Sequence, residues 1–386
     1  MKYDFDEIID RRNTNSFKWD STQHVEDVVP MWVADMDFRS ADPILHALDK
    51  KLQHGVFGYA HVPDAYYEAE INWWQKRHHY QIEKEWIAFS PGVIAALAAI
   101  LQAFTNPGDH ILIQSPVYNS FYTTITNNGR GIVENELIND GMSYEIDFED
   151  FEAKASDERV KLFVLCNPHN PVGKVWRKDE LERLSAICRK HNVLVIADEI
   201  HRDLVFDGQP YIPFAAIDRM NSITCTSPSK TFNVAGLKTA NMITANAEYK
   251  KKFKQVLLVN GMHEPNVFGV EALIAAYTEG EEWLDQLLVY LKANRDYFLS
   301  FVQDKLPDLK VIAPGSTYLM WVDCRNTGIG SQELSRRLLE EAGLRINEGS
   351  IYGKAGDGFI RINIGCTRAV LADGLTRLEK FMTAMK

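Results

Sequence analysis

A lysine flanked by small hydroxyl residues lies past the middle of the chain, in the stretch TSPSKTFNVAGL. Lys230 follows a run of residues typical of a buried strand. An amine in this position is a candidate for a Schiff base with an aldehyde and for a general base. Taken alone, Lys230 is more simply interpreted as a solvated surface lysine. Its significance depends on the side chains that accompany it.

An aspartate follows a buried run upstream of this lysine. The predicted strand Val193–Ala197 leads directly into Asp198, at the carboxyl edge of a parallel sheet, where α/β proteins bind ligands. A carboxylate there is costly to desolvate unless a cation receives it, and a protonated pyridine nitrogen is such a cation. His201, three residues on, could reach a phenolic oxygen of the same ring. A helix N-cap aspartate and a core histidine are the plainer alternatives.

An amide and an aromatic ring are expected at the same edge. Asn170 lies in the stretch NPHNPVG, where two X-Pro steps favour a rigid, extended loop. Its amide group supplies a donor for the phenolic oxygen. Tyr118 follows another strand and could stack on a ring. A structural turn and core packing are the alternatives for these two residues.

Two anion sites complete the set. The stretch SPGVI, residues 90–94, precedes a predicted helix over Ile94–Phe104, and the free N–H groups of a helix N-terminus favour a phosphate. Ser227 and Lys238 could add a hydroxyl group and a positive charge. Arg361 lies inside an apolar, strand-like run and requires a carboxylate partner. A substrate carboxylate and an internal salt bridge are both open for this arginine.

Together these side chains meet the requirements of one cofactor, pyridoxal 5′-phosphate (PLP). They supply an amine, a partner for the pyridine nitrogen, donors for the phenolic oxygen, a phosphate cradle and a clamp for a carboxylate. We therefore expect Lys230 to hold PLP and to act as the general base at the Cα–H bond of an amino-acid substrate. These residues do not separate β-elimination from transamination, because both reactions begin in the same way.

The elements that would position these residues alternate between strands and helices. Apolar runs typical of strands covered on both faces occur at His110–Gln114, Val160–Cys166, Val193–Ala197 and Ser222–Thr226. A helical stripe over Lys178–Lys190 separates two of them. The pattern predicts a parallel sheet covered by helices.

The C-terminal third has a different, α+β pattern. It predicts helices over Glu281–Leu306 and Ser331–Ala342, strands over Val311–Ala313, Tyr318–Val322 and Phe359–Ile364, and a last helix capped by Thr367. Ser331 is expected as an N-cap, with Gly343 just past the end of the same helix. We expect a large α/β domain over residues 45–285 and a smaller domain built from residues 1–44 and 286–386.

Composition limits the partners and the location. The chain of 386 residues carries a formal net charge of −11, which repels nucleic-acid backbones and anionic membranes. Its best apolar run, Val93–Phe104, is too short to span a bilayer, and we expect no secretory signal in the acidic first residues. The five cysteines are scattered without CxxC spacing. We therefore expect reduced thiols, no metal site and a cytoplasmic protein.

The chain resembles, over nearly its whole length, the fold-type I PLP enzymes of the class I/II aminotransferase superfamily. More narrowly, it resembles the MalY/PatB group of cystathionine β-lyases, also called C–S β-lyases. The narrower resemblance rests on MWVADMDF (31–38), FGYA (57–60), NPHNPVGK (167–174), DEIH (198–201), SPSKTFNVAG (227–236) and Arg361. It implies a large domain with a mostly parallel, seven-stranded sheet covered by helices, and a smaller α+β domain.

The resemblance also implies roles for individual residues. Lys230 would form the Schiff base and act in catalysis with Asp198, which pairs with the pyridine nitrogen, and Tyr118, which stacks on the ring. Further cofactor contacts would come from Gly92, Val93, Ile94, Asn170, His201, Ser227, Ser229, Lys238 and Tyr59. The substrate would contact Arg361, Asn170, Tyr59 and Ala34. Tyr59 would reach the site from the neighbouring subunit of a homodimer. His201 and Lys238 stand where many aminotransferases carry Tyr and Arg.

The activity implied by the resemblance is cleavage of L-cystathionine or related cysteine S-conjugates to a thiol, pyruvate and ammonia. An aminotransferase is the alternative, because only the narrower resemblance favours the lyase. A regulatory or binding protein on the same fold is the alternative of another class. We identify no second arginine for a side-chain carboxylate, which argues against dicarboxylic substrates.

We expect Lys230→Ala to abolish turnover, because Lys230 is the amine assigned to the cofactor and to the Cα proton. Borohydride reduction of the PLP-loaded protein, followed by peptide mass mapping, should mark Lys230 alone. Near-normal turnover by the variant, or a label on another lysine, would contradict the assignment.

Overall fold

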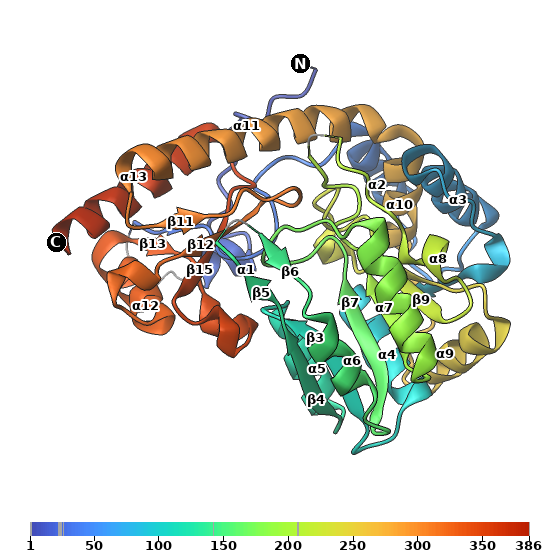
Figure 1. Ribbon diagram of the computed structural model, residues 1–386. Coiled ribbons are helices and arrows are strands. Elements are labelled where there is room, and N and C mark those ends of the chain that lie inside the picture. Colours follow the sequence, from blue (N-terminus) through green and yellow to red (C-terminus); the bar gives the residue numbers. More distant parts are fainter. Residues whose placement is uncertain (1, 22–24, 26, 142, 207, 386) are drawn as a thin grey trace.

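The computed structural model describes residues 2–21, 25, 27–141, 143–206 and 208–385. A seven-stranded sheet covered by helices forms one part of the molecule, and a smaller antiparallel sheet with its own helices lies beside it (Figure 1). This architecture confirms the predicted fold class.

The large sheet is parallel except for one strand. Its order is β2 (Ile87–Ser90), β10 (Ala240–Ile243), β9 (Ser222–Thr226), β8 (Leu194–Asp198), β7 (Val160–Cys166), β3 (His110–Ser115) and β4 (Gly131–Glu136). Strand β10 is antiparallel to both of its neighbours, and every other adjacent pair is parallel. Six strands therefore present their carboxyl ends at one edge, where Cys166, Asp198 and Cys225 are paired across β7, β8 and β9.

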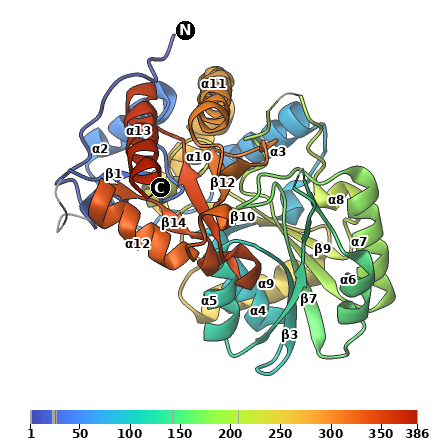
Figure 2. The same ribbon diagram turned by 60° about the vertical axis from the view of Figure 1, so that its left-hand side comes forward.

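Helices cover both faces of this sheet, because its strands are apolar on both sides. One face packs against α4 (Val93–Phe104), α5 (Asn119–Asn127) and α9 (Ala247–Val259). The other face packs against α6 (Phe148–Ala155), α7 (Lys178–Lys190) and α8 (Phe214–Ile217). Consecutive strand residues alternate between the two cores: in β7, Phe163 belongs to one and Val164 to the other. Figure 2 shows the two groups of helices on opposite sides of the sheet.

The smaller sheet is antiparallel and lies near the C-terminus. Its order is β11 (Lys310–Val311), β12 (Leu319–Asp323), β15 (Phe359–Asn363) and β14 (Asn347–Glu348). The neighbouring helices are α11 (Glu281–Lys305), α12 (Ser331–Ala342) and α13 (Arg368–Ala384). Strand β1 (Val29–Pro30) pairs in parallel with β13 (Leu344–Arg345) in a separate two-stranded sheet, which brings N-terminal residues next to the C-terminal part of the chain.

The remaining elements connect the two sheets. Helix α10 (Val267–Glu279) packs against α2 (Asp42–His54) and α3 (Asp64–His78). Strands β5 (Ile138–Asn139) and β6 (Tyr144–Glu145) form a separate pair, and α1 (Phe17–Asp20) is a single turn. Short 3₁₀ helices occupy Lys84–Trp86, Ala235–Leu237, Arg325–Thr327, Gly349–Tyr352 and Lys354–Gly356.

Most predicted elements are confirmed to within a residue or two, but the N-cap of α12 is wrong. Gly330 occupies the N-cap position, and Ser331 is the first helical residue. The Ser331 hydroxyl donates to Asp357 Oδ1 at 2.9 Å, so a carboxylate 26 residues away takes the group that was expected to cap the helix. Gly343 ends α12 in the left-handed conformation, and the Thr367 side chain caps α13, both as predicted.

All five cysteines are buried with free thiols. Within the described ranges, no group of His, Cys, Asp or Glu side chains is arranged to hold a metal ion. Among the same residues, no helix combines the length and the apolar character that a membrane crossing requires.

Candidate active site

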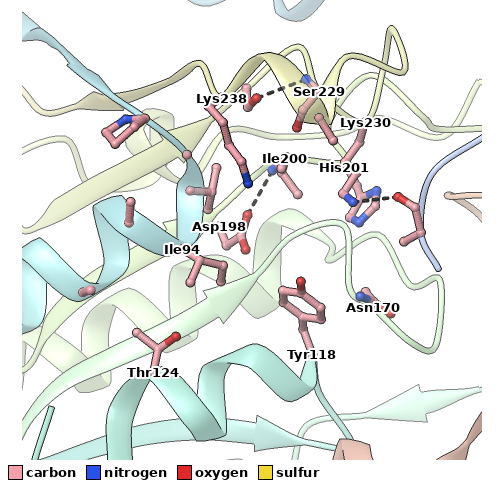
Figure 3. Close-up of a pocket in the computed structure, with 18 of the residues that line it drawn as sticks. Ile94, Tyr118, Thr124, Asn170, Asp198, Ile200, His201, Ser229, Lys230 and Lys238 are labelled. Carbon is pink, nitrogen blue, oxygen red and sulfur yellow. Dashed lines mark hydrogen bonds between the residues drawn. The ribbon is translucent and has the colours of Figure 1, made fainter. Parts of the chain in front are cut away.

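A cavity of about 550 Å³ opens at the carboxyl edge of the large sheet. Twelve of the predicted site residues line it: Ala34, Gly92, Val93, Ile94, Tyr118, Asn170, Asp198, His201, Ser227, Ser229, Lys230 and Lys238. Figure 3 labels Tyr118, Asn170, Asp198, His201, Lys230 and Lys238 among them, and these side chains come from segments far apart in the sequence and face a shared space. Arg361 and Tyr59 are the predicted site residues that do not line the cavity.

The sheet topology explains why these residues meet. Gly92 follows β2, Tyr118 follows β3 and Asn170 follows β7, each within four residues of the strand end. Asp198 ends β8, and Lys230 follows β9. Because all five strands run in the same direction, the residues after them converge on one edge.

The amine of Lys230 is buried and held by a backbone carbonyl. Its Nζ donates to the carbonyl oxygen of Ala34 at 2.6 Å, and the same oxygen accepts the hydroxyl of Tyr318 at 3.0 Å. Burial, with the nearby charge of Arg361, lowers the pKa of Lys230 to about 8. A sizeable fraction of this amine is therefore uncharged near pH 8, as a nucleophile or base requires.

Asp198 is a buried carboxylate without a cation. Its side chain accepts one backbone hydrogen bond, from Ile200 N to Oδ1 at 3.2 Å, and no Lys, Arg or His nitrogen of the described residues lies within 4.0 Å. Burial raises the pKa of Asp198 to about 7, against the opposing charge of Lys230. A protonated ring nitrogen placed against this carboxylate would supply the missing partner.

His201 lies close by and is neutral. Burial lowers its pKa to about 3, and the positive charges of Lys230 and Arg361 act in the same direction. Its Nδ1 has no hydrogen-bond partner among the described residues. A buried imidazole with an unused nitrogen fits a ligand oxygen better than it fits a satisfied core histidine.

Arg361 is a buried cation held by neutral groups. Its Nη1 donates to Asn170 Oδ1 at 3.0 Å, Nη2 donates to the carbonyl of Trp32 at 2.9 Å, and the guanidinium lies 5.0 Å from the centre of the Tyr352 ring. Its Nε has no hydrogen-bond partner, and no described residue forms a salt bridge with it. An internal salt bridge is therefore absent from the described residues, which leaves a substrate carboxylate as the remaining prediction.

The expected phosphate cradle consists mainly of backbone. Gly92 is the N-cap of α4, and a Cβ atom there would meet nothing within 4 Å, so the space beside it is open. The first N–H groups of α4 have no intrahelical acceptors. The Ser227 hydroxyl donates to Thr239 O at 2.6 Å and accepts from Ser229 N at 3.0 Å, so its hydrogen is already used. Backbone N–H groups and Lys238 are thus the available donors.

This arrangement fits PLP. The buried Asp198 carboxylate suits the pyridine nitrogen, the unused His201 nitrogen suits the phenolic oxygen, and the N-terminus of α4 suits the phosphate. Asn170 adds a donor, because Oδ1 accepts from Arg361 and its Nδ2 is the atom left to donate.

Tyr59 lies outside the cavity. It occupies the connection between α2 and α3, where its side chain is 93% exposed. Within this chain it does not line the cavity.

One wall of the site was not foreseen. The backbone of residues 32–36 is held by side chains far away in sequence: Asn363 Nδ2 donates to the carbonyls of Val33 and Asp35, and Asn233 bonds both N and O of Met36. Ala34 lines the cavity and its carbonyl accepts the Lys230 amine, while its contact with substrate stays a prediction. No local signal in MWVADMDF marks these carbonyls as acceptors, because nearly all of their donors lie about 200 or more residues away; Arg11, which donates to Met36 O at 3.1 Å, is the nearer exception.

Comparison with known proteins agrees with this geometry. The family model for aminotransferase class I and II matches residues 27–378. Cystathionine beta-lyase PatB of Bacillus subtilis (strain 168) is 43% identical over 381 residues, which cover 97% of this chain and 98% of that protein. The crystal structure of cystalysin from Treponema denticola, which contains PLP, is 35% identical with a TM-score of 0.97, and 100% of each chain is covered. A PLP-bound putative aminotransferase from Clostridium difficile 630 is 40% identical with a TM-score of 0.96, covering 98% of this chain and 100% of that one.

We expect Asp198→Asn to stabilise the cofactor-free protein at and above pH 7 but not near pH 4. The folded-state pKa of Asp198 is raised from 3.8 to about 7, so wild type loses stability progressively from about pH 4, where the unfolded chain ionises, to about pH 7, and loses no more above that. Above pH 7 the free energy of unfolding of the variant should exceed that of wild type by about 1–3 kcal/mol, and near pH 4 the two values should agree. Urea unfolding at both pH values measures this difference. The exposed Asp49→Asn serves as control, and equal stability of wild type and Asp198→Asn at pH 8 would contradict the prediction.

Proposed function

The chain belongs to the aminotransferase class I and II family, and we propose that within this family it is a PLP-dependent carbon–sulfur β-lyase. It cleaves L-cystathionine, or a related cysteine S-conjugate, to a thiol and 2-aminoacrylate, which water converts to pyruvate and ammonia. The observation that carries the proposal is the pair formed by a buried amine, Lys230, and a buried carboxylate without a cation, Asp198, in one cavity.

PLP, when bound, supplies an electron sink for the negative charge that develops at Cα of the substrate. Lys230 would hold its aldehyde carbon and Asp198 its ring nitrogen. Asn170 and His201 would bind the phenolic oxygen, and Tyr118 would stack on the ring. Gly92, Val93, Ile94 and Lys238 would bind the phosphate, with Ser227 and Ser229 beside them.

Arg361 and Lys230 act on two groups attached to Cα of the substrate. The Arg361 guanidinium binds the α-carboxylate, and its contacts with Asn170 and Trp32 prevent it from turning away. The Lys230 amine removes the proton from Cα, a role suited to a base with a pKa of about 8. Once protonated, the amine donates to the Ala34 carbonyl, which already lies 2.6 Å from it. The bond from Cβ to sulfur then breaks, and the thiolate leaves with the electron pair.

An aminotransferase is the second candidate, because the two reactions diverge only after the Cα–H bond is broken. The 40% identity to a structure described as a putative aminotransferase supports it, and the 43% identity to a cystathionine β-lyase supports the lyase. A purely regulatory protein is disfavoured by intact Lys230, Asp198 and Asn170 around one cavity, with Arg361 bonded to Asn170.

We further propose a homodimer in which Tyr59 of each subunit completes the cavity of the other. The connection between α2 and α3 exposes 93% of Tyr59, 63% of Val56 and 52% of Phe57. Neighbouring apolar side chains with this exposure are typical of an interaction surface. The five free, buried thiols support a reducing, cytoplasmic location.

With L-cystathionine and no keto acid, the PLP-loaded protein should release thiol and pyruvate in equal amounts. Thiol is measured with a chromogenic disulfide and pyruvate with lactate dehydrogenase, and Lys230→Ala is the control without the amine. Turnover only in the presence of a keto acid would identify an aminotransferase instead. PLP binding without any turnover would support the regulatory alternative.

We expect Tyr59→Ala and Lys230→Ala subunits, each inactive alone, to recover activity when they are co-expressed with different affinity tags. A mixed dimer holds one cavity with both substitutions and one with neither, so random pairing should restore about a quarter of the wild-type activity. If Tyr59 served its own subunit, neither cavity of the mixed dimer would be complete. Absence of recovery in purified mixed dimers, or full activity of Tyr59→Ala alone, would therefore contradict the shared site.

A further inference from the structure

A buried cluster of charged side chains lies behind the cavity and has no part in the chemistry described above. It consists of Glu70 on α3 and of Arg202 and Asp203 in the loop after β8, and all three side chains are almost fully buried. Arg202 Nη2 lies 3.2 Å from Glu70 Oε1. Burial lowers the pKa of the neighbouring His78, against the opposing effect of Asp203. The cluster therefore contains two carboxylates and one guanidinium. Burying such a set costs free energy unless hydrogen bonds compensate for the lost hydration.

Asp203 connects helix α3 to the loop that carries Lys230. Its Oδ1 accepts from Trp73 Nε1 at 3.0 Å and faces His78 Nε2 at 2.9 Å, and both residues belong to α3. Its Oδ2 accepts the hydroxyl of Thr231, the residue after Lys230, at 2.9 Å. Although burial opposes ionisation, His78 and Arg202 hold the pKa of Asp203 below its ordinary value, so the carboxylate stays a charged acceptor.

The backbone around Lys230 is fixed at three points. Thr231 is held by Asp203 on one side. Ser229 N donates to Ser227 Oγ at 3.0 Å on the other side. Asn233 bonds the backbone of Met36 at 3.0 and 2.9 Å, which ties the same loop to the segment whose Ala34 carbonyl accepts the amine. The contact between Thr231 and Asp203 is the one of the three that reaches the charged cluster.

Glu70 likewise connects neighbouring strand ends through buried hydrogen bonds. Its carboxylate accepts from Trp74 Nε1 at 2.8 Å, Asn241 Nδ2 at 2.8 Å, Thr226 Oγ1 at 3.3 Å and Arg202 Nη2 at 3.2 Å. These donors lie on α3, β10, the end of β9 and the loop after β8. One buried carboxylate thus joins the strand that precedes Ser227 to the loop that contains His201.

We propose that Asp203 is a positioning residue for the reaction: through the Thr231 hydroxyl it fixes the backbone from which the Lys230 amine reaches the substrate. Glu70 anchors the same framework through Thr226 and Arg202. The kinetic part of this proposal rests on the lyase activity proposed above, and its spectroscopic part requires only bound PLP.

The test removes one hydroxyl group from the holoenzyme. Thr231→Val keeps the size of the side chain but leaves Asp203 Oδ2 without its donor, and Thr231→Ser restores the donor. The matched control is Thr224→Val in β9, because the Thr224 hydroxyl is buried and has no hydrogen-bond partner among the described residues. The readouts are kcat and KM for L-cystathionine, the pH midpoint of the absorbance change of bound PLP, and the thermal unfolding temperature.

We expect Thr231→Val to lower kcat by about tenfold with KM changed less than about threefold, and to move the pH midpoint of the absorbance change. Thr231→Ser should recover most of the rate and the wild-type midpoint, and Thr224→Val should match wild type in both. A merely structural effect would lower the unfolding temperature without moving the midpoint.

The proposal is overturned if Thr231→Val matches Thr224→Val in kcat and in the pH midpoint. Should Thr231→Val fail to fold, Trp73→Phe removes a different donor of Asp203 and must change the same readouts in the same direction; unchanged values would overturn the proposal as well. If the wild-type protein binds PLP but leaves L-cystathionine intact, only the proposed lyase activity is contradicted. The absorbance comparison still tests the position of Lys230.

Discussion

Burial of the Asp198 carboxylate without a cation is the constraint on which the rest of the site depends. The end of β8 lies between two apolar cores and Asp198 is only 5% exposed, so water solvates the charge poorly, and one backbone N–H at 3.2 Å is its hydrogen bond within the described chain. Such a group favours its protonated form until a positive ring nitrogen arrives. Burial of Asp198 lowers the stability of the empty protein, and cofactor binding removes this penalty because the ring nitrogen pairs with the carboxylate. The buried carboxylate therefore raises the affinity for the cofactor and lowers the stability of the empty protein.

The second requirement is a set of groups that face this carboxylate from other directions. Parallel strands bring Gly92, Tyr118, Asn170 and Lys230 to one edge of the large sheet. The C-terminal sheet contributes Arg361, and the N-terminal segment contributes Ala34, which lines the cavity and whose carbonyl accepts the Lys230 amine. Neither sheet holds a complete site, because the Lys230 amine, its Ala34 acceptor and the Arg361 clamp come from three separate parts of the chain.

Sequence reasoning succeeded where chemistry follows a strand. Asp198, Asn170 and Lys230 were predicted because each comes just after a continuous apolar run, and the carboxyl ends of parallel strands converge. It failed where a distant partner decides the outcome, because Asp357 accepts the Ser331 hydroxyl that was expected to cap α12. Asp203 also escaped notice, although it lies only two residues past DEIH, because its donors on α3 are over a hundred residues away. Local patterns predict elements and strand ends, whereas long-range hydrogen bonds appear only in the folded chain.

The contact between Asn170 and Arg361 has a consequence for how the two sheets share one cavity. Because Oδ1 accepts from Arg361, turning the amide over would set two donors against each other. The direction in which Nδ2 points is thus dictated by a residue of the C-terminal sheet, although Asn170 itself belongs to the loop after β7. Without the C-terminal sheet, the Asn170 amide would be free to flip. The direction in which it donates into the cavity therefore depends on both sheets being folded together.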